Sequence, residues 1–306
     1  MATPKPERGL LQELTLHCRL WLSGVKEGFC LHRCVIYWVH DPTIWWKTVR
    51  CFTFNGVIFG GSIVIFKALL APGFRWLVGT AVPAWASALD ASLYLVYTFT
   101  WLFPVYIISF IVNCLWYQEI AERAFRVGQQ RAVQSGQQAK ARVLAGKPMP
   151  FPHMLAQELF RMTLFCVFFI QSLVAGCIPF IGPLANFVLL SWLYAFYFFD
   201  YKWAMTNVPL VTRVQHFEGH FAFFAGFGSV CTLATLIWPF FEGVAVMGVI
   251  FPLFVMVACE ADPRLALQQC ESKLLDIGPT AGSQLSGNAE CSFAQAAPLS
   301  ASHLCY

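Results

Sequence analysis

The sequence predicts an all-α, polytopic membrane protein with about six apolar helical segments. Composition is the first reason, because 58% of its 306 residues are hydrophobic and only 12% are charged, about half the charged share of a soluble domain. The second reason is that several runs of about 20 residues or more contain almost no charge. The third reason is that Lys and Arg lie almost entirely between these runs.

Residues 1–51 are expected to form a cytosolic N-terminal region with an amphipathic helix. Large apolar residues recur there at helical spacing, and charged residues mostly fall between them. This pattern is typical of a helix that lies in the membrane interface, with its apolar stripe toward lipid and its bases toward headgroups. The stripe consists of Leu10, Leu14, Cys18, Trp21, Val25 and Phe29.

Two single apolar segments follow, at residues 52–71 and 92–113. A transmembrane helix needs about 20 apolar residues to cross about 30 Å of hydrocarbon, and both segments are long enough. Lys67 is the only charged side chain in either of them. It either extends its amine to the far interface or contributes to a path for anions. Lys67 is therefore the candidate permeation residue.

Residues 162–199 predict a pair of apolar segments. They carry no charged side chain, and one helix of that length would measure about 57 Å, too long for a single crossing. The stretch CIPFIGPL contains two prolines and a glycine near the middle of the run. We expect it to break the run into segments 162–180 and 183–199.

A second long apolar run, residues 221–259, repeats this plan. We expect its break at Glu242-Gly243, which separates segments 221–241 and 243–259. Each of the two pairs either crosses the membrane or enters from one side and returns as a re-entrant hairpin. Both arrangements leave the long loops on the same side of the bilayer, so the sequence allows either of them.

The distribution of basic residues predicts the orientation. Eighteen of the 20 Lys and Arg residues lie in 1–51, 114–161, 200–220 and 260–306, whereas Arg75 lies on the opposite side. The positive-inside rule therefore places both termini and the loop 114–161 in the cytosol. The helical membrane domain then spans 52–263. Residues 264–306 are rich in Ser, Ala and Gly and are expected to be a mostly disordered cytosolic tail.

Charged residues gather where two of the apolar segments end. Trp116 precedes Glu119, and Arg123 follows at the i,i+4 spacing that supports an ion pair on a helix. Asp200, Tyr201 and Lys202 follow the segment that ends at residue 199. Such residues either mark a helix end at the membrane–water boundary or take part in function.

No pattern in the sequence predicts catalysis. HFEGH, at residues 216–220, lacks the HExxH order of zinc proteases, and the spacing in CLHRC, at residues 30–34, does not fit common zinc sites. We find no nucleophile elbow, phosphate loop or dinucleotide fingerprint. We therefore expect no catalytic, cofactor-binding or metal-binding residues and no nucleic-acid partner.

The motif WYQEIA, at residues 116–121, is similar to a motif of one known family. Other matches follow in the same order along roughly residues 24–263. On these motifs the chain resembles the etoposide-induced protein 2.4 family. The further matches are GVKE at 24–27, Asn55-Gly56, KPMPFP at 147–152, FIQ at 169–171, LYAFYFFDYKW at 193–203, Arg213, Glu218, GFG at 226–228, FPLF at 251–254, Ala258, Glu260 and Ala261.

The resemblance implies a multi-pass protein of the endoplasmic reticulum that is needed for autophagic flux, with links to growth suppression and cell death. The family is related to the bacterial CysZ sulfate permeases, whose fold pairs long spans with half-penetrating hairpins. That relation implies the alternative function, permeation of an anion or small solute. Two features depart from animal members. The chain lacks their Arg-rich run before the first span, and its segment 128–146 is longer.

We hypothesise that Glu119 and Asp200 pair with bases such as Lys202 or Arg213 and so clamp the cytosolic face. The leading interpretation is a non-enzymatic protein whose partners are the lipid bilayer and cytosolic proteins that contact residues 114–161. A homo-oligomer is compatible with the sequence as well.

Overall fold

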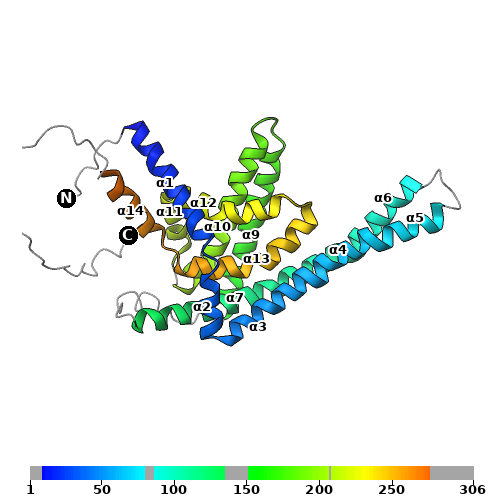
Figure 1. Ribbon diagram of the computed structural model, residues 1–306, viewed down its shortest axis with the longest axis horizontal. Helices are drawn as coiled ribbons and strands as arrows, with labels where there is room; N and C mark the ends of the chain where they lie inside the picture. The colour runs from blue at the N-terminus through cyan, green and yellow to red at the C-terminus, as the bar shows by residue number, and fades with distance from the viewer. Residues whose placement is uncertain (1–8, 80–85, 135–150, 207, 276–306) are drawn as a thin grey trace, which may run out of the picture.

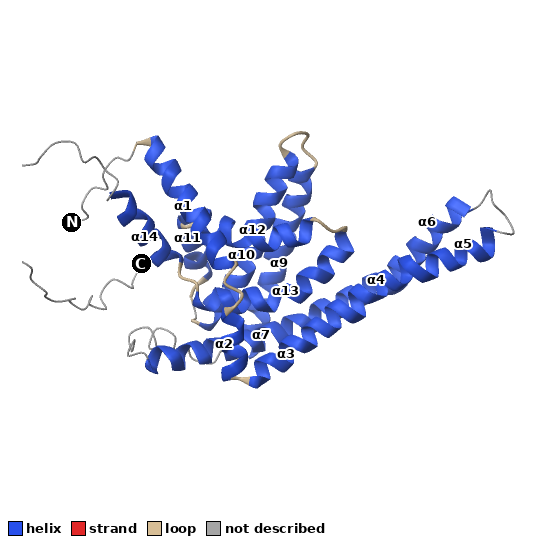
Figure 2. Ribbon diagram, viewed as in Figure 1, coloured by secondary structure: helices blue, strands red, loops and turns tan. Residues whose placement is uncertain are grey.

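The computed structural model describes residues 9–79, 86–134, 151–206 and 208–275, and all regular elements within them are helices (Figures 1 and 2). This confirms the all-α class. Four helices in this part of the chain are long and apolar enough to cross a membrane, which makes the protein a multi-pass membrane protein. They are Pro42–Trp76, Ala91–Gln134, Gly182–Met205 and Phe240–Glu260.

A long helical hairpin projects from the body of the molecule (Figure 1). Asp41 caps its first helix, because the Asp41 carboxylate accepts the Thr43 N–H at 2.9 Å and Pro42 occupies the first turn. The outgoing arm comprises α3 (Pro42–Phe52), η1 (Thr53–Gly60), α4 (Gly61–Ile65), η2 (Phe66–Leu70) and α5 (Ala71–Gly79). The returning arm comprises α6 (Ala86–Tyr97), η4 (Thr98–Leu102) and α7 (Phe103–Gln134).

Much of the loop expected at residues 114–161 is helical. Helix α7 continues past the apolar segment to Gln134, and α9 (Phe151–Gly176) begins within the expected loop. Ion pairing at i,i+4 supports the extension, since Arg123 Nε lies 3.6 Å from Glu119 Oε1. The connection is therefore helical at both ends, and residues 135–150 lie outside the described residues.

The two expected hairpins are present, but only one breaks where the sequence predicted. Helix α9 turns into α10 (Gly182–Met205) at the predicted stretch, where Phe180 takes a left-handed φ of 64°. The second break lies at Ile237–Pro239 and not at Glu242-Gly243. Pro239 has a ψ of 160° and ends the helical path, so Glu242 falls in the first turn of α13 (Phe240–Glu260).

Helix α12 (Phe221–Leu236) follows α11 (Leu210–Gly219) across a bend of 89°. If this bent pair counts as one span, the described residues contain five candidate spans. With 16 residues, α12 alone measures about 24 Å, less than the roughly 30 Å of hydrocarbon.

Helix α1 (Leu10–Gly28) packs on α12 through glycines. A Cβ on Gly24 would lie 2.1 Å from the Phe223 carbonyl oxygen, and one on Gly226 would lie 2.0 Å from that of Trp21. Only glycine permits this backbone contact. The buried face of α1 is Leu16, Leu20, Gly24 and Gly28. The predicted apolar stripe lies on another face and leaves Leu10, Leu14 and Phe29 exposed.

The start of the predicted tail is ordered. Helix α14 (Pro263–Leu275) contacts α1 and α12, where Cys270 joins a small core with Leu16, Leu20 and Ala222. Residues 264–275 of the tail are therefore helical, because α14 buries apolar side chains against α1 and α12. Residues 276–306 lie outside the described residues.

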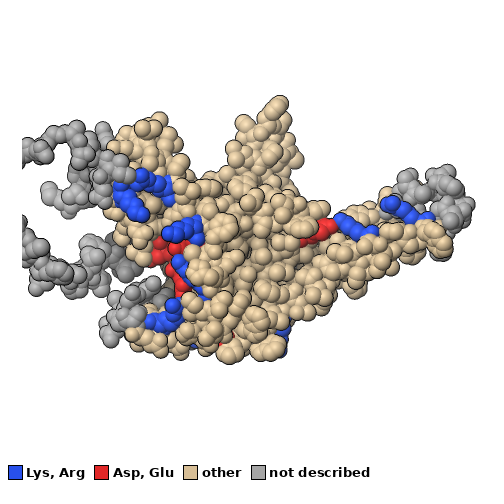
Figure 3. All heavy atoms as spheres, viewed as in Figure 1, with Lys and Arg blue, Asp and Glu red and all other residues tan. Residues whose placement is uncertain are grey.

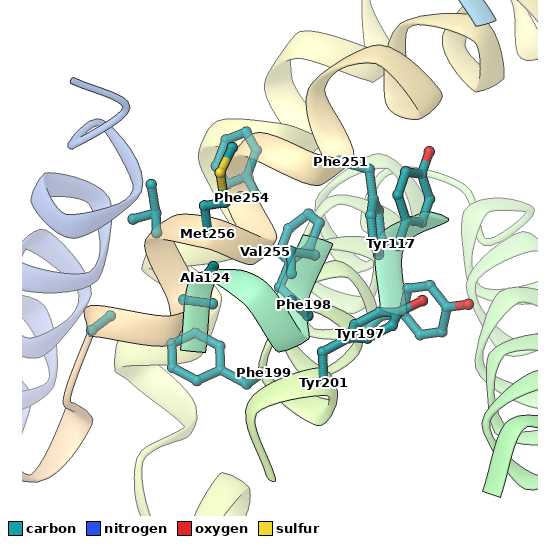
Figure 4. Packing of buried hydrophobic residues seen from close by; sticks show 14 of the residues in the cluster. Tyr117, Ala124, Tyr197, Phe198, Phe199, Tyr201, Phe251, Phe254, Val255 and Met256 are labelled. Carbon is teal, nitrogen blue, oxygen red and sulfur yellow. The ribbon is translucent and has the colours of Figure 1, made fainter. Parts of the chain in front are cut away.

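Aromatic rings fill the core where α7, α10, α12 and α13 meet (Figure 4). The Phe251 ring stacks on Tyr117 at 4.4 Å, and the Phe198 ring stacks on Phe254 at 5.1 Å. Burial of rings this large dominates core energetics. This core fixes the ends of α7, α10 and α13, from which the charged residues project.

Candidate functional site

The least exposed ion pair in the described part of the chain joins Asp200, near the end of α10, to Arg213 on α11. Arg213 Nη1 donates to Asp200 Oδ1 at 2.6 Å, and Arg213 Nε donates to the Val208 carbonyl at 2.8 Å. The two side chains are only 6% and 7% exposed. Asp200 therefore has one of the predicted partners, and the pair ties α11 against α10.

Glu119 has different partners from those predicted. It forms an ion pair with Lys47 from α3, and Arg123 contacts its other oxygen. The two bases predicted for it contact other groups, since Lys202 donates to the Ala261 carbonyl and Arg213 donates to Asp200. Lys47 lies 72 positions earlier in the chain, and no local pattern could indicate a contact over that separation.

Arg123 extends this contact to the start of the long hairpin. Its Nη1 donates to Asp41 Oδ2 at 3.1 Å. Burial opposes the charge of Asp41, but hydrogen bonds from the Thr43 N–H and from Arg123 outweigh it and lower the pKa of the Asp41 carboxyl. Asp41 is thus both the cap of α3 and an ion-pair partner of α7.

A second chain of ion pairs was not expected. Glu260, at the end of α13, accepts from Arg131 at 2.7 Å and lies 3.8 Å from Arg33, at the start of α2 (Arg33–His40). Arg33 also donates to Glu27 at 2.6 Å. Burial works against the charge of Arg33, but the contact with Glu27 raises the pKa of Arg33.

The two chains of ion pairs connect the N-terminal helices with α7 and α13. We call the surface that they form the ion-pair face. Figure 3 shows acidic and basic side chains mingled at one end of the molecule. The ion-pair face consists of Glu27, Arg33, Asp41, Lys47, Glu119, Arg123, Arg131 and Glu260.

The remaining predicted residues have structural contacts. Lys202 Nζ donates to the Ala261 carbonyl at 2.7 Å and lies 5.9 Å from the centre of the Phe199 ring. Tyr201 is fully buried in the aromatic core, and Trp116 packs edge-on against Phe54 at 6.0 Å. Of the predicted residues, Asp200, Tyr201, Lys202 and Arg213 therefore lie at or beside the end of α10. Glu119 instead lies in the ion-pair face.

Lys67 forms an ion pair with Glu242, in the first turn of α13. The sequence predicted that Lys67 either extends toward the far interface or contributes to an anion path. In the structure the break at Pro239 places Glu242 in the first turn of α13, where it pairs with Lys67. The pair joins the tip of the α12–α13 hairpin to the outgoing arm of the long hairpin. Pairing neutralises the charge that a permeation path would use.

A cavity of about 230 Å³ lies where the long hairpin meets the α9–α10 and α12–α13 hairpins. One wall carries Asn55, Ser109 and Asn113, which hydrogen-bond to one another. Another wall carries Ser172, whose hydroxyl donates to Asn186.

Comparison with known proteins identifies the family. The model of the family described as "Sulfate transporter CysZ/Etoposide-induced protein 2.4" matches residues 30–252. The chain belongs to this family. Among the relatives of this EI24 family member is an EI24 homolog of Arabidopsis thaliana, 34% identical over 269 residues that cover 80% of this chain and 83% of the relative.

Two further relatives extend the EI24 comparison. An EI24 homolog of Dictyostelium discoideum is 30% identical over 251 residues, or 82% of this chain and 76% of that protein. The Caenorhabditis elegans protein named Ectopic P granules protein 4 is 28% identical over 163 residues, or 52% and 47% of the two chains. No solved structure matches.

The EI24 family match contains most of the polar contacts described above. Asp200, Arg213 and the Lys67–Glu242 pair lie inside residues 30–252, whereas Glu27 and Glu260 lie just outside it. The arrangement can join helices and present charge at one end of the molecule. Its ion pairs hold segments that are far apart in the chain.

Proposed function

We propose that this member of the EI24 family is a non-enzymatic membrane protein of the endoplasmic reticulum that supports autophagic flux. The observation that carries the proposal is the family match over residues 30–252, together with the resemblance of motifs such as WYQEIA and LYAFYFFDYKW. The same resemblance implies a link with growth suppression and cell death. The orientation that we propose has both termini in the cytosol, because the loops rich in Lys and Arg lie on that side.

The ion-pair face is the surface that we propose for cytosolic protein partners. It includes the part of α7 beyond the apolar segment. Charged rims of this kind steer partners and set specificity more than affinity. We therefore expect loss of a charge there to weaken partner binding without unfolding the helical body.

Autophagic flux in cells deleted for the gene tests the proposal. Degradation of a reporter delivered to lysosomes would be measured after wild type, Glu119→Gln or Glu13→Gln is restored at matched levels. Glu13 is an exposed glutamate on α1 that lies outside the family match and serves as the matched control. We expect wild type and Glu13→Gln to restore flux and Glu119→Gln to restore it only in part. Normal flux after deletion would refute the proposed role.

Permeation of an anion or small solute is the second candidate, and the family description, which names a sulfate transporter, favours it. Its test is sulfate uptake into proteoliposomes that contain the full chain, with Lys67→Ala as the variant. Uptake above that of empty liposomes that depends on Lys67 would support permeation. We expect no such uptake, because Lys67 is paired with Glu242 and no Lys, Arg or His side chain is among the lining residues of the cavity.

A further inference from the structure

The cavity between the three hairpins has a polar inner wall and an apolar mouth. Asn55, Ser109 and Asn113 are buried on the inner wall. At the other end, Leu173, Trp238 and Phe240 line the cavity and are exposed on the molecular surface. Because these exposed residues belong to the α9–α10 turn region and the α12–α13 turn region, the cavity opens between the two hairpin tips. In the re-entrant arrangement these tips lie at membrane depth, and the mouth of the cavity faces hydrocarbon.

The inner wall has unused capacity to accept hydrogen bonds. The Asn113 side-chain oxygen accepts one bond, from Asn55, and the Ser109 oxygen accepts one, from Asn113. Each of these oxygens has two lone pairs. One acceptor site on each residue is therefore available to a donor inside the cavity.

Asn186 offers the opposite chemistry. Its side-chain oxygen accepts from the Ser172 hydroxyl. Its amide nitrogen carries two N–H groups, and within the described part of the chain neither has a hydrogen-bond acceptor. In hydrocarbon an amide donor without a partner is costly. An occupant that supplies an acceptor would remove this cost.

The cavity contains no charge to balance a charged occupant. Its lining residues include no Lys, Arg, His, Asp or Glu. An ion placed there would be desolvated without a counter-ion, which is strongly unfavourable. The occupant is therefore uncharged, and it carries both a donor for the inner wall and an acceptor for Asn186.

The size of the cavity limits how much of the occupant it holds. A dry protein cavity of about 150 Å³ binds benzene, so a cavity of about 230 Å³ accommodates a somewhat larger group. That is enough for a polar head with its first few carbons but not for whole acyl chains. The chains would leave through the mouth beside Leu173 and Phe240.

We propose that the cavity binds the head of an uncharged lipid that presents a hydroxyl and a carbonyl group, the chemistry of diacylglycerol and ceramide. The lipid enters between the two hairpin tips. Its hydroxyl donates to Asn113 or Ser109, and its carbonyl accepts from the amide of Asn186. The site is independent of the autophagic role proposed above.

Photolabelling of the full chain in phosphatidylcholine nanodiscs tests the site. The probes are a photoactivatable, clickable diacylglycerol and a phosphatidic acid that carries the same acyl chains. We expect the diacylglycerol to label peptides of α10 and α13 at least about fivefold more than the phosphatidic acid. Both Asn186→Leu and the isosteric Asn186→Asp should lower diacylglycerol labelling about fivefold, the change that corresponds to one net hydrogen bond of about 1 kcal/mol.

Gln171→Leu is the matched control, because Gln171 is an exposed amide on α9 that does not line the cavity. It should leave diacylglycerol labelling unchanged. Equal labelling by both probes, or wild-type labelling of both Asn186 variants, would overturn the proposal. So would competition by millimolar sulfate, which would indicate an anion site and favour permeation. Size-exclusion profiles of the variants establish that any loss of labelling occurs in folded protein.

Discussion

Removal of the charge on Asp200 should destabilise the protein by an amount that the structure allows us to work out. Asp200 and Arg213 are 6% and 7% exposed and lie 2.6 Å apart. Asp200→Asn leaves the Arg213 guanidinium buried without its counter-charge, and breaking a buried pair in this way costs about 3–5 kcal/mol. Because Arg213 Nε keeps its bond to the Val208 carbonyl, we expect a loss near the lower limit, about 3 kcal/mol.

The assay is the midpoint of thermal unfolding in detergent, measured at one fixed scan rate because unfolding of such proteins is commonly irreversible. For a domain of this size, about 3 kcal/mol corresponds to a fall of roughly 6–12 °C. The double variant Asp200→Leu/Arg213→Met removes both charges and should recover most of that loss, since apolar residues often replace a buried ion pair at little cost.

Glu119→Gln is the control for this experiment. The Glu119 side chain is 40% exposed and that of Lys47 is 13% exposed, so their pair is partly buried and water screens it from the Glu119 side. We expect its loss to cost about 1 kcal/mol and to lower the midpoint by no more than about 4 °C. If Asp200→Asn unfolds at the wild-type midpoint, or if the double variant is as unstable as the single one, an unpaired buried charge is not the cause.

Three further predictions concern packing, pH and topology. Gly226→Ala should lower the midpoint by several degrees, because its Cβ would lie 2.0 Å from the Trp21 carbonyl oxygen, whereas Gly128→Ala, with nothing within 4 Å, should not; equal midpoints would contradict the close α1–α12 contact. The lowered pKa of Asp41 means that its charged form stabilises the fold above the ordinary Asp pKa, about 3.9, and that this contribution is lost as the pH falls through the lowered value. Wild type should therefore lose more of its midpoint between pH 6 and pH 3 than Asp41→Asn, and parallel losses would refute this. In microsomes, in a background without exposed cysteines, Trp76→Cys should react with an impermeant maleimide only after the membrane is permeabilised, and Ile237→Cys should not react. The reason is that Glu242, near the tip of the α12–α13 hairpin, pairs with Lys67, about 18 Å before the end of α5 at Gly79. Luminal labelling of both cysteines would mean that the hairpin crosses.

The positions of the apolar runs and of the first break followed from the sequence, because they depend on residues that are neighbours in the chain. The length of residues 162–199 required a break, and Pro179 with Gly182 supplied it. The second break was placed wrongly, since Glu242 was taken as the interruption, whereas Pro239 cannot continue a helix and Glu242 can occupy a first turn.

Contacts between distant segments could not be predicted in the same way. The pairing of Asp200 with Arg213 could be predicted from the sequence, because the two residues are 13 positions apart and lie on adjoining helices. The partner of Glu119 lies 72 positions away, and that of Lys67 lies 175 positions away. The cavity likewise needs Asn55, Asn113 and Asn186 from three different arms, so no local pattern could indicate it.

By itself, the sequence determined that this protein is a helical membrane protein of the EI24 family, with Lys and Arg between its apolar runs and an acid at the end of α10 that needs a partner. Local composition and spacing are sufficient for those features, because hydrophobic runs and helix breaks act over a few turns. The tertiary structure alone decided which charges meet, which glycines let α1 lie against α12, and where a polar cavity remains. These features arise only when segments far apart in the chain pack together. The geometry of that packing depends on all of the segments at once, so the sequence of any single segment does not predict it.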